Sequence, residues 1–246
     1  MPRLRAIIAL LVCFLVAGSG RANAFNSIDP DAMLLLQRMS ETLTAAKSII
    51  VLARVQERFE LRGHRTATYS DAQAVIARPA RLYAAMQSDG RDVSAWYDGR
   101  TFAVYDRASN VYTRTPSLLD DDDLLDLLVH RVGAVPMPLA AVLVSHPYAA
   151  LSRQIYAAKT LGQAQIGETP CERLYFSGPQ IDWELWVSLD DEHPLPARLA
   201  FVYKTRPGRP TVVVAFLSWY LDARLPLSKF RFLPPRAAAA REFKRF

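Results

Sequence analysis

Residues 96–102 read Trp96-Tyr97-Asp98-Gly99-Arg100-Thr101-Phe102, and this stretch carries the strongest local fold signal in the chain. An Asp-Gly pair suits the tight turns that join neighbouring antiparallel strands, because both residues tolerate positive φ. Aromatic and β-branched residues, which favour strands, flank the pair on both sides. The stretch therefore predicts a β-hairpin centred on Asp98 and Gly99.

Segments with a period of two extend from this hairpin in both directions. Residues 48–115 contain several short apolar runs separated by turn residues such as Gly63 and Asn110. Further along, Ile181 to Val187 alternates, so that Ile181, Trp183, Leu185 and Val187 share one face, and Asp182, Glu184 and Trp186 share the other. A final strand is predicted at Phe230 to Leu233, ahead of two prolines. Short strands joined by tight turns indicate an antiparallel meander.

Helical spacing interrupts this pattern at three places. Asp29 and Pro30 are typical of a helix start, and residues 30–46 predict an amphipathic helix. A second helix is predicted from a cap at Ser117 to Gly133, and a third over residues 139–145. The later two are either ordinary packing helices or a cover over an opening in a curved sheet.

The N-terminus is typical of a secretory signal peptide. Arg3 and Arg5 precede the apolar run Ala6–Gly18, and Ala22-Asn23-Ala24 forms a small-residue cleavage site. We expect residues 1–24 to be a signal peptide cleaved after Ala24 and residues 25–246 to form a single periplasmic domain. Removing residues 1–24 leaves 27 basic and 24 acidic residues, a net charge of +3. This small excess and an exported location argue against a nucleic-acid partner.

The residues that could carry chemistry do not form a recognisable site. His64, His130, His146 and His193 lack metal-ligand spacing. The run Asp120–Asp123 lacks the spacing of a calcium loop, so an acidic helix start is favoured over a calcium site. Cys171 has no base near it in the sequence, and phosphate-loop, dinucleotide and nucleophile-elbow motifs are absent from the sequence. We therefore expect a protein that is not an enzyme, with no catalytic residue, metal or cofactor.

The aromatic residues are concentrated in the expected strands. A curved sheet with one aromatic-rich face can hold a hydrophobic ligand. The alternative is that these side chains simply fill the core, and the residue pattern alone favours this alternative.

Several segments resemble, in the same order, a family of predicted periplasmic proteins of unknown function that is grouped with the outer-membrane lipoprotein carriers LolA and LolB. The segments that carry the resemblance are Ile28-Asp29-Pro30-Asp31-Ala32, Tyr97-Asp98-Gly99-Arg100-Thr101, Asn110-Val111-Tyr112, Pro138-Leu139, His146-Pro147-Tyr148, Asp182-Trp183-Glu184-Leu185-Trp186, Leu195-Pro196 and Tyr203-Lys204. The resemblance implies an α+β, mainly β fold: an antiparallel half-open β-barrel, LolA/LolB-like, with lid helices over an apolar cavity.

This resemblance and the strand alternation together predict a periplasmic binding module, and possible carrier, for a lipid or acylated ligand. The expected cavity residues are Tyr83, Phe102, Trp183, Leu185, Leu199 and Phe201, with Leu128 and Leu139 from the lid helices. The expected partner is a hydrophobic ligand, and peripheral membrane contact is compatible with it. The alternative is an envelope protein-interaction or stress-sensor module without bound lipid, which would use Trp186 and the basic end with Arg241, Lys244 and Arg245.

Overall fold

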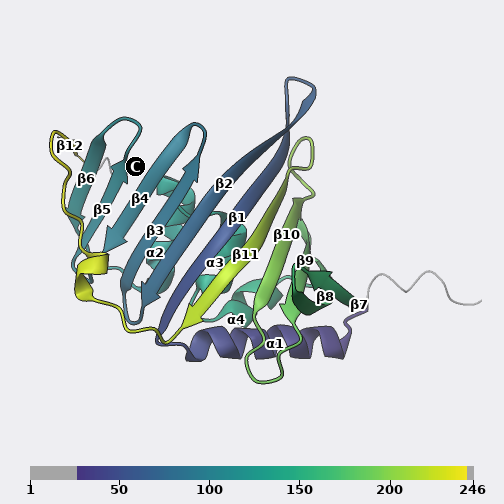
Figure 1. Cartoon of the computed structure of the whole chain (residues 1–246). Coiled ribbons are helices and arrows are strands. Elements are labelled where there is room, and N and C mark those ends of the chain that lie inside the picture. The colour runs from purple at the N-terminus through teal and green to yellow at the C-terminus, as the bar shows by residue number, and fades with distance from the viewer. Residues whose placement is uncertain (1–26, 243–246) are drawn as a thin grey trace, which may run out of the picture.

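The computed structural model describes residues 27–242 (Figure 1). The predicted signal peptide, its cleavage site, Lys244 and Arg245 lie outside the described residues. One sheet of twelve strands dominates the fold, in the spatial order β12-β6-β5-β4-β3-β2-β1-β11-β10-β9-β8-β7. The strands are β1 (Ser48–Leu61), β2 (His64–Ala77), β3 (Arg81–Ser88), β4 (Arg91–Tyr97), β5 (Thr101–Asp106), β6 (Val111–Pro116), β7 (Ala157–Ile166), β8 (Thr169–Ser177), β9 (Ile181–Ser188), β10 (Pro196–Tyr203), β11 (Thr211–Leu221) and β12 (Ala239–Arg241).

Neighbouring strands are antiparallel, except that β12 runs parallel to β6. The predicted hairpin at Asp98 and Gly99 is confirmed, because it joins β4 to β5 with Tyr97 opposite Phe102. The Asp98 carboxylate accepts from the backbone N–H groups of Arg100 and Thr101, at 3.0 and 2.8 Å. Gly99 has a φ of +93°, which residues with a side chain rarely adopt.

The sheet does not close on itself. Strands β7 and β12 are its two ends, and no ladder joins them within residues 27–242. The fold is therefore α+β and mainly β, with the sheet forming an antiparallel half-open barrel, as predicted.

The helices cover one face of this sheet, which we call the inner face. They are α1 (Pro30–Ala45), α2 (Asp121–Leu127), the π-helical turn η1 (Leu128–Val132), α3 (Met137–Leu143) and α4 (Pro147–Ser152). Figure 1 shows α1 along one end of the strands and α2, α3 and α4 behind the sheet. The predicted helix over residues 30–46 is confirmed, with the Asp29 carboxylate capping it by accepting from the N–H of Asp31. We refer to α2, η1, α3 and α4 together as the lid helices.

The main core lies between the inner face and the helices. Leu36, Met39 and Leu43 of α1 are fully buried there, as are Leu124 and Leu143 of the lid helices. The alternation predicted for β9 is confirmed, since Trp183, Leu185 and Val187 belong to this core and Ile181 packs against it.

The other face, which we call the outer face, carries a smaller aromatic cluster. Phe232 lies against Trp96, Tyr105 and Tyr112, with ring centroids 4.9–6.1 Å apart. The chain reaches this position after β11 through a short 3-10 helix, η2 (Leu227–Phe230). The prediction of a strand at Phe230 to Leu233 is therefore wrong. Phe232 instead packs into the aromatic cluster on the outer face, and the last strand is β12.

None of the helices between residues 27 and 242 is long and apolar enough to cross a membrane.

Cys171 lies at the start of β8 and is fully buried. Burial raises the pKa of its thiol above the ordinary value, so the reactive thiolate is disfavoured. We expect a thiol reagent to label Cys171 more than about tenfold more slowly in the native protein than in denaturant, because labelling requires local opening. The rate of colour release from an aromatic disulfide reagent, measured on a chain without Cys13, tests this. Equally fast labelling would mean that the start of β8 opens freely.

Candidate functional site

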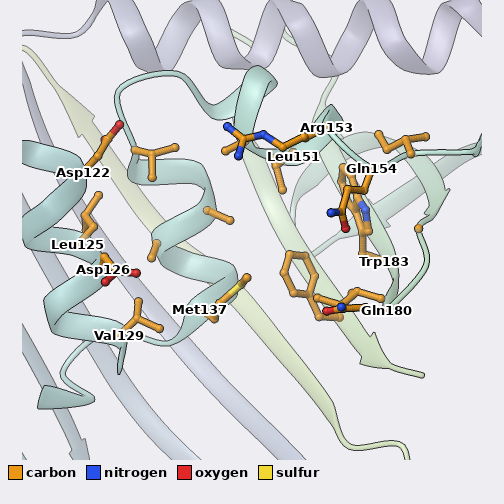
Figure 2. A pocket seen from close by; sticks show the side chains of 18 of the residues that line it. Asp122, Leu125, Asp126, Val129, Met137, Leu151, Arg153, Gln154, Gln180 and Trp183 are labelled. Carbon is orange, nitrogen blue, oxygen red and sulfur yellow. The ribbon is translucent and has the colours of Figure 1, made fainter. Parts of the chain in front are cut away.

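An apolar pocket lies between the lid helices and the inner face at β9 and β10 (Figure 2). Its volume is about 550 Å³, within the range of small-molecule sites. Most of its wall is hydrocarbon from the four lid elements α2, η1, α3 and α4, from strands β9 and β10, and from the loops beside them. The apolar lining residues are Leu125, Val129, Met137, Ala140, Ala141, Val144, Ala150, Leu151, Ile155, Pro179, Ile181, Trp183 and Phe201.

Strand alternation positions the aromatic floor of this apolar pocket. Phe201 of β10 lies directly opposite Trp183 of β9 in the ladder, so both side chains reach the inner face at the same level. The Trp183 ring stacks on Phe176 of β8, with centroids 4.0 Å apart and planes 19° apart. Since Phe176 is fully buried, it fixes the indole from behind.

The lid helices, which face this aromatic floor across the pocket, begin and end at residues with clear sequence signals. The Asp120 carboxylate accepts from the N–H of Asp123 at 2.8 Å and begins α2. The acidic run therefore starts a helix, as predicted, although Asp120 and not Ser117 is the cap. Gly133, with a φ of +66°, ends η1. The helix predicted over residues 139–145 is present as α3, two residues earlier.

Polar side chains line only the exposed margin of the apolar pocket. Asp122, Asp126, His130, Arg153, Gln154 and Gln180 are all exposed. Asp122 accepts from the N–H of Ser145 at 2.7 Å, and Asp126 lies 3.5 Å from His130, one helical turn away. These contacts are local, and the groups do not converge on one point where a reacting atom could be held.

A second hollow of about 530 Å³ adjoins the apolar pocket, and we call it the basic extension. The two share Val129, His130, Met137, Gln180 and Ile181. Arg58, Arg91 and Arg206 line the basic extension, with Glu57 as its one acidic lining residue. Tyr203 also lines it, and burial raises the pKa of the Tyr203 hydroxyl, which therefore stays neutral.

The structure distributes the predicted cavity residues over three environments. Trp183 and Phe201 line the apolar pocket. Phe102, Leu128, Leu139, Leu185 and Leu199 belong to the surrounding core and are at most 1% exposed, so they lie behind the wall. Tyr83 lies away from the apolar pocket, on the outer face. Its ring packs against Trp96, and the Lys229 ammonium lies 4.0 Å from the centroid of the ring.

Sequence reasoning missed the contribution of α4 and the loop after it. Leu151 and Ile155 line the apolar pocket, but no helix was predicted over residues 147–152. Pro147 occupies the first position of α4, a common place for proline in helices, and this signal could have identified the helix.

Trp186, assigned to the alternative interaction surface, lies on the outer face as predicted. Its ring is sandwiched by the guanidinium groups of Arg173 and Arg198, 5.2 and 4.9 Å from the centroid. Only 8% of Trp186 is exposed, so the ring is already covered by its own chain. Arg241, from the same alternative, is exposed in β12.

A hydrogen-bonded cluster beside the β8–β9 turn contains residue types found in nucleophilic enzymes. The Lys204 ammonium donates to the Tyr156 hydroxyl at 2.8 Å and to the Ser177 hydroxyl at 3.2 Å, and lies 2.8 Å from the Asp182 carboxylate. Desolvation opposes the charge on Lys204, but the bonds to Asp182 and Tyr156 outweigh it and raise the pKa of the ammonium. A protonated lysine does not act as a base toward Ser177, and the bonds from Lys204, which directly follows β10, link it to the end of β8 and the start of β9.

Residues 27–242 contain no group of three or more His, Cys, Asp or Glu side chains that could hold a metal ion.

Comparison with solved structures finds proteins that resemble the chain in fold. The Mycobacterium tuberculosis lipoprotein LppX is 12% identical, with 81% of this chain and 99% of that chain covered and a TM-score of 0.46. A LolA superfamily protein from Nitrosomonas europaea is 13% identical, with 82% and 97% covered and a TM-score of 0.34. The Pseudomonas aeruginosa MucA/MucB complex gives 14% identity, 82% and 61% coverage and a TM-score of 0.42.

No curated protein matches the sequence. A protein family matches residues 32–244, which is nearly the whole of the described chain. The resemblance noted in the sequence is thereby confirmed. The chain belongs to the family described as "Predicted periplasmic protein (DUF2092)".

Proposed function

We propose that the protein is a periplasmic binding module for a lipid or acylated ligand, and that the acyl chain occupies the apolar pocket. The observation that carries this proposal is the lining: Trp183 and Phe201 form an aromatic floor, and the lid helices supply aliphatic side chains opposite them. Polar residues lie only at the exposed margin. Burial of an acyl chain in such a site is worth about 0.8 kcal/mol per methylene group.

The character of the wall favours a flexible apolar ligand over a polar metabolite. Specific sites for polar metabolites aim a few buried donors and acceptors at the ligand. Leu125, Trp183 and Phe201 are buried wall residues of this pocket, whereas its charged side chains, such as Asp126 and Arg153, are exposed. We accordingly propose binding without catalysis, and neither a metal nor a cofactor forms part of the proposal.

The proposal includes the maturation of the chain. Residues 1–24 act as a signal peptide that is cleaved after Ala24, and residues 25–246 form one periplasmic domain. A basic flank, a short apolar run and an Ala-x-Ala site support this proposal.

Native mass spectrometry of the protein recovered from the periplasm, followed by organic extraction, tests the ligand directly. The expected result is a stoichiometric lipid or acylated species. An empty protein that also takes up no fluorescent fatty-acid probe would contradict the proposal and favour the alternative, an envelope protein-interaction or stress-sensor module.

A pair of variants on α4 links the probe to the apolar pocket. Ala150 lines this pocket, whereas its neighbour Ala149 does not, and both are exposed. We expect Ala150→Trp to weaken binding of a fluorescent fatty acid by about tenfold, because the indole occupies part of the acyl site. Ala149→Trp, the matched control, should bind within about twofold of the parent protein. Equal affinities for the two variants in a fluorescence titration would place the probe elsewhere.

A further inference from the structure

We propose that the basic extension binds the head group of the ligand, and that the ligand is an anionic amphiphile whose head group carries a phosphate or carboxylate. This inference rests on the proposed function, because it assigns the head group of the molecule whose acyl chain occupies the apolar pocket. The two hollows share five lining residues, so one molecule can extend from the hydrocarbon wall to the arginines.

Topology brings the arginines to one end of the sheet. Arg91 begins β4 just after the β3–β4 turn, and Arg206 lies in the β10–β11 turn. Both turns are at the same end as the β1–β2 turn, because β1, β3 and β10 run in the same direction in the antiparallel sheet. The two guanidinium groups therefore approach the basic extension from different walls.

Arg91 is held in place by the end of the π-helical turn η1. Its guanidinium donates to the carbonyl of Val132 and packs against Gly133. A Cβ atom at position 133 would overlap this guanidinium, so the glycine provides the space that Arg91 occupies. The bond to Val132 uses only part of a group with five N–H donors, and the others are available for an oxyanion.

Arg206 is held by an aromatic ring instead. Its guanidinium carbon lies 4.2 Å from the centroid of Tyr203, an inner-face residue that is buried. Stacking engages the flat face of the guanidinium and leaves its N–H edge free, which is the edge that binds phosphate or carboxylate in a bidentate fashion.

Within residues 27–242, no carboxylate lies within ion-pair distance of Arg91 or Arg206, whereas Arg54, Arg78, Arg107 and Arg173 are each paired. Glu57 is the acidic residue of the lining, so the arginines outnumber it. An excess of unpaired guanidinium beside an apolar wall matches the two ends of an anionic amphiphile.

Arg65 offers a matched control. It is exposed near the start of β2, at the same end of the sheet, and it does not line the basic extension. Its side chain therefore contributes charge to the same end of the sheet without facing the head-group site.

The test compares two ligands of equal chain length, an alkyl phosphate and the corresponding alcohol, as competitors of a neutral fluorescent acyl probe. We expect the phosphate to bind at least about tenfold more tightly. Arg91→Gln and Arg206→Gln should each remove most of this preference and leave affinity for the alcohol unchanged. Arg65→Gln should retain the preference.

The outcomes separate the two proposals. If neither ligand displaces the probe and the probe itself does not bind, the proposed function fails. If both ligands bind equally, or if Arg65→Gln removes the preference as fully as Arg91→Gln, only the head-group assignment fails. Inorganic phosphate should not compete at the concentrations at which the alkyl phosphate does, and equal competition would instead indicate a site for the free anion.

Discussion

Asp121→Ala is expected to lower the free energy of unfolding by about 3 kcal/mol, because it leaves the buried guanidinium of Arg78 without its charged partner. Asp121 is the first residue of α2, and its Oδ2 lies 3.1 Å from Nη1 of Arg78, the residue that follows β2. Its Oδ1 accepts from the N–H of Ala80 at 2.8 Å. The two side chains are only 12% and 17% exposed, so water cannot replace the lost partner fully. The same guanidinium donates to the carbonyl of Leu143 at 3.4 Å, and this joins the sheet to α3 as well.

Denaturant unfolding followed by circular dichroism measures this loss. Asp123→Ala is the matched control, since Asp123 is in the same first turn but exposed, and its loss should stay below about 1 kcal/mol. The double variant Arg78→Met/Asp121→Leu should recover most of the stability, because it removes both charges together. Equal losses for Asp121→Ala and Asp123→Ala would show that the contact with Arg78 carries little stability.

The local elements of the fold were predictable because their signals lie in adjacent residues. The hairpin at Asp98 and Gly99 depends on turn geometry, and α1 depends on the cap at Asp29. The alternation at Trp183 and Leu185 depends on burial of one face of β9. Each is determined within a few residues, so no knowledge of distant contacts was needed.

The C-terminal segment was not predictable for the opposite reason. Phe230 and Phe232 flank Arg231 as in a strand, yet Phe232 contacts residues more than a hundred positions earlier, such as Trp96 and Tyr105. The alternation reports burial at every second residue, which an extended chain lying across the outer face satisfies as well as a strand does.

The candidate site also combines residues that could be predicted from nearby sequence with residues that depend on distant parts of the fold. Trp183 and Phe201 were predicted because both the aromatic character and the strand phase were visible. Tyr83 was selected for its aromatic ring, although Leu82 and Ala84 on either side of it are buried in the main core, which puts Tyr83 on the outer face. The basic extension could not be predicted, since Arg91 and Arg206 are brought together only by the order of the strands.

Phe176→Ala is expected to lower the free energy of unfolding by about 3–5 kcal/mol and to weaken acyl binding in the folded protein. Phe176 is fully buried and stacks on Trp183, which lines the apolar pocket. Deleting the ring leaves a cavity behind the indole, so the wall loses both packing energy and rigidity. Denaturant unfolding measures the first effect, and titration with a fluorescent fatty acid, well below the midpoint of unfolding, measures the second.

Two further variants separate packing behind the pocket from general damage to β8. Phe176→Leu refills most of the cavity, so its stability loss should be below about 1.5 kcal/mol and its acyl affinity close to that of the parent protein. Tyr175→Ala removes a ring from the outer face of the same strand, where it is only half-buried, and should leave acyl affinity unchanged. If Tyr175→Ala weakened binding as much as Phe176→Ala, the effect would reflect β8 as a whole. Unchanged binding in a folded Phe176→Ala protein would mean that the acyl chain does not contact Trp183.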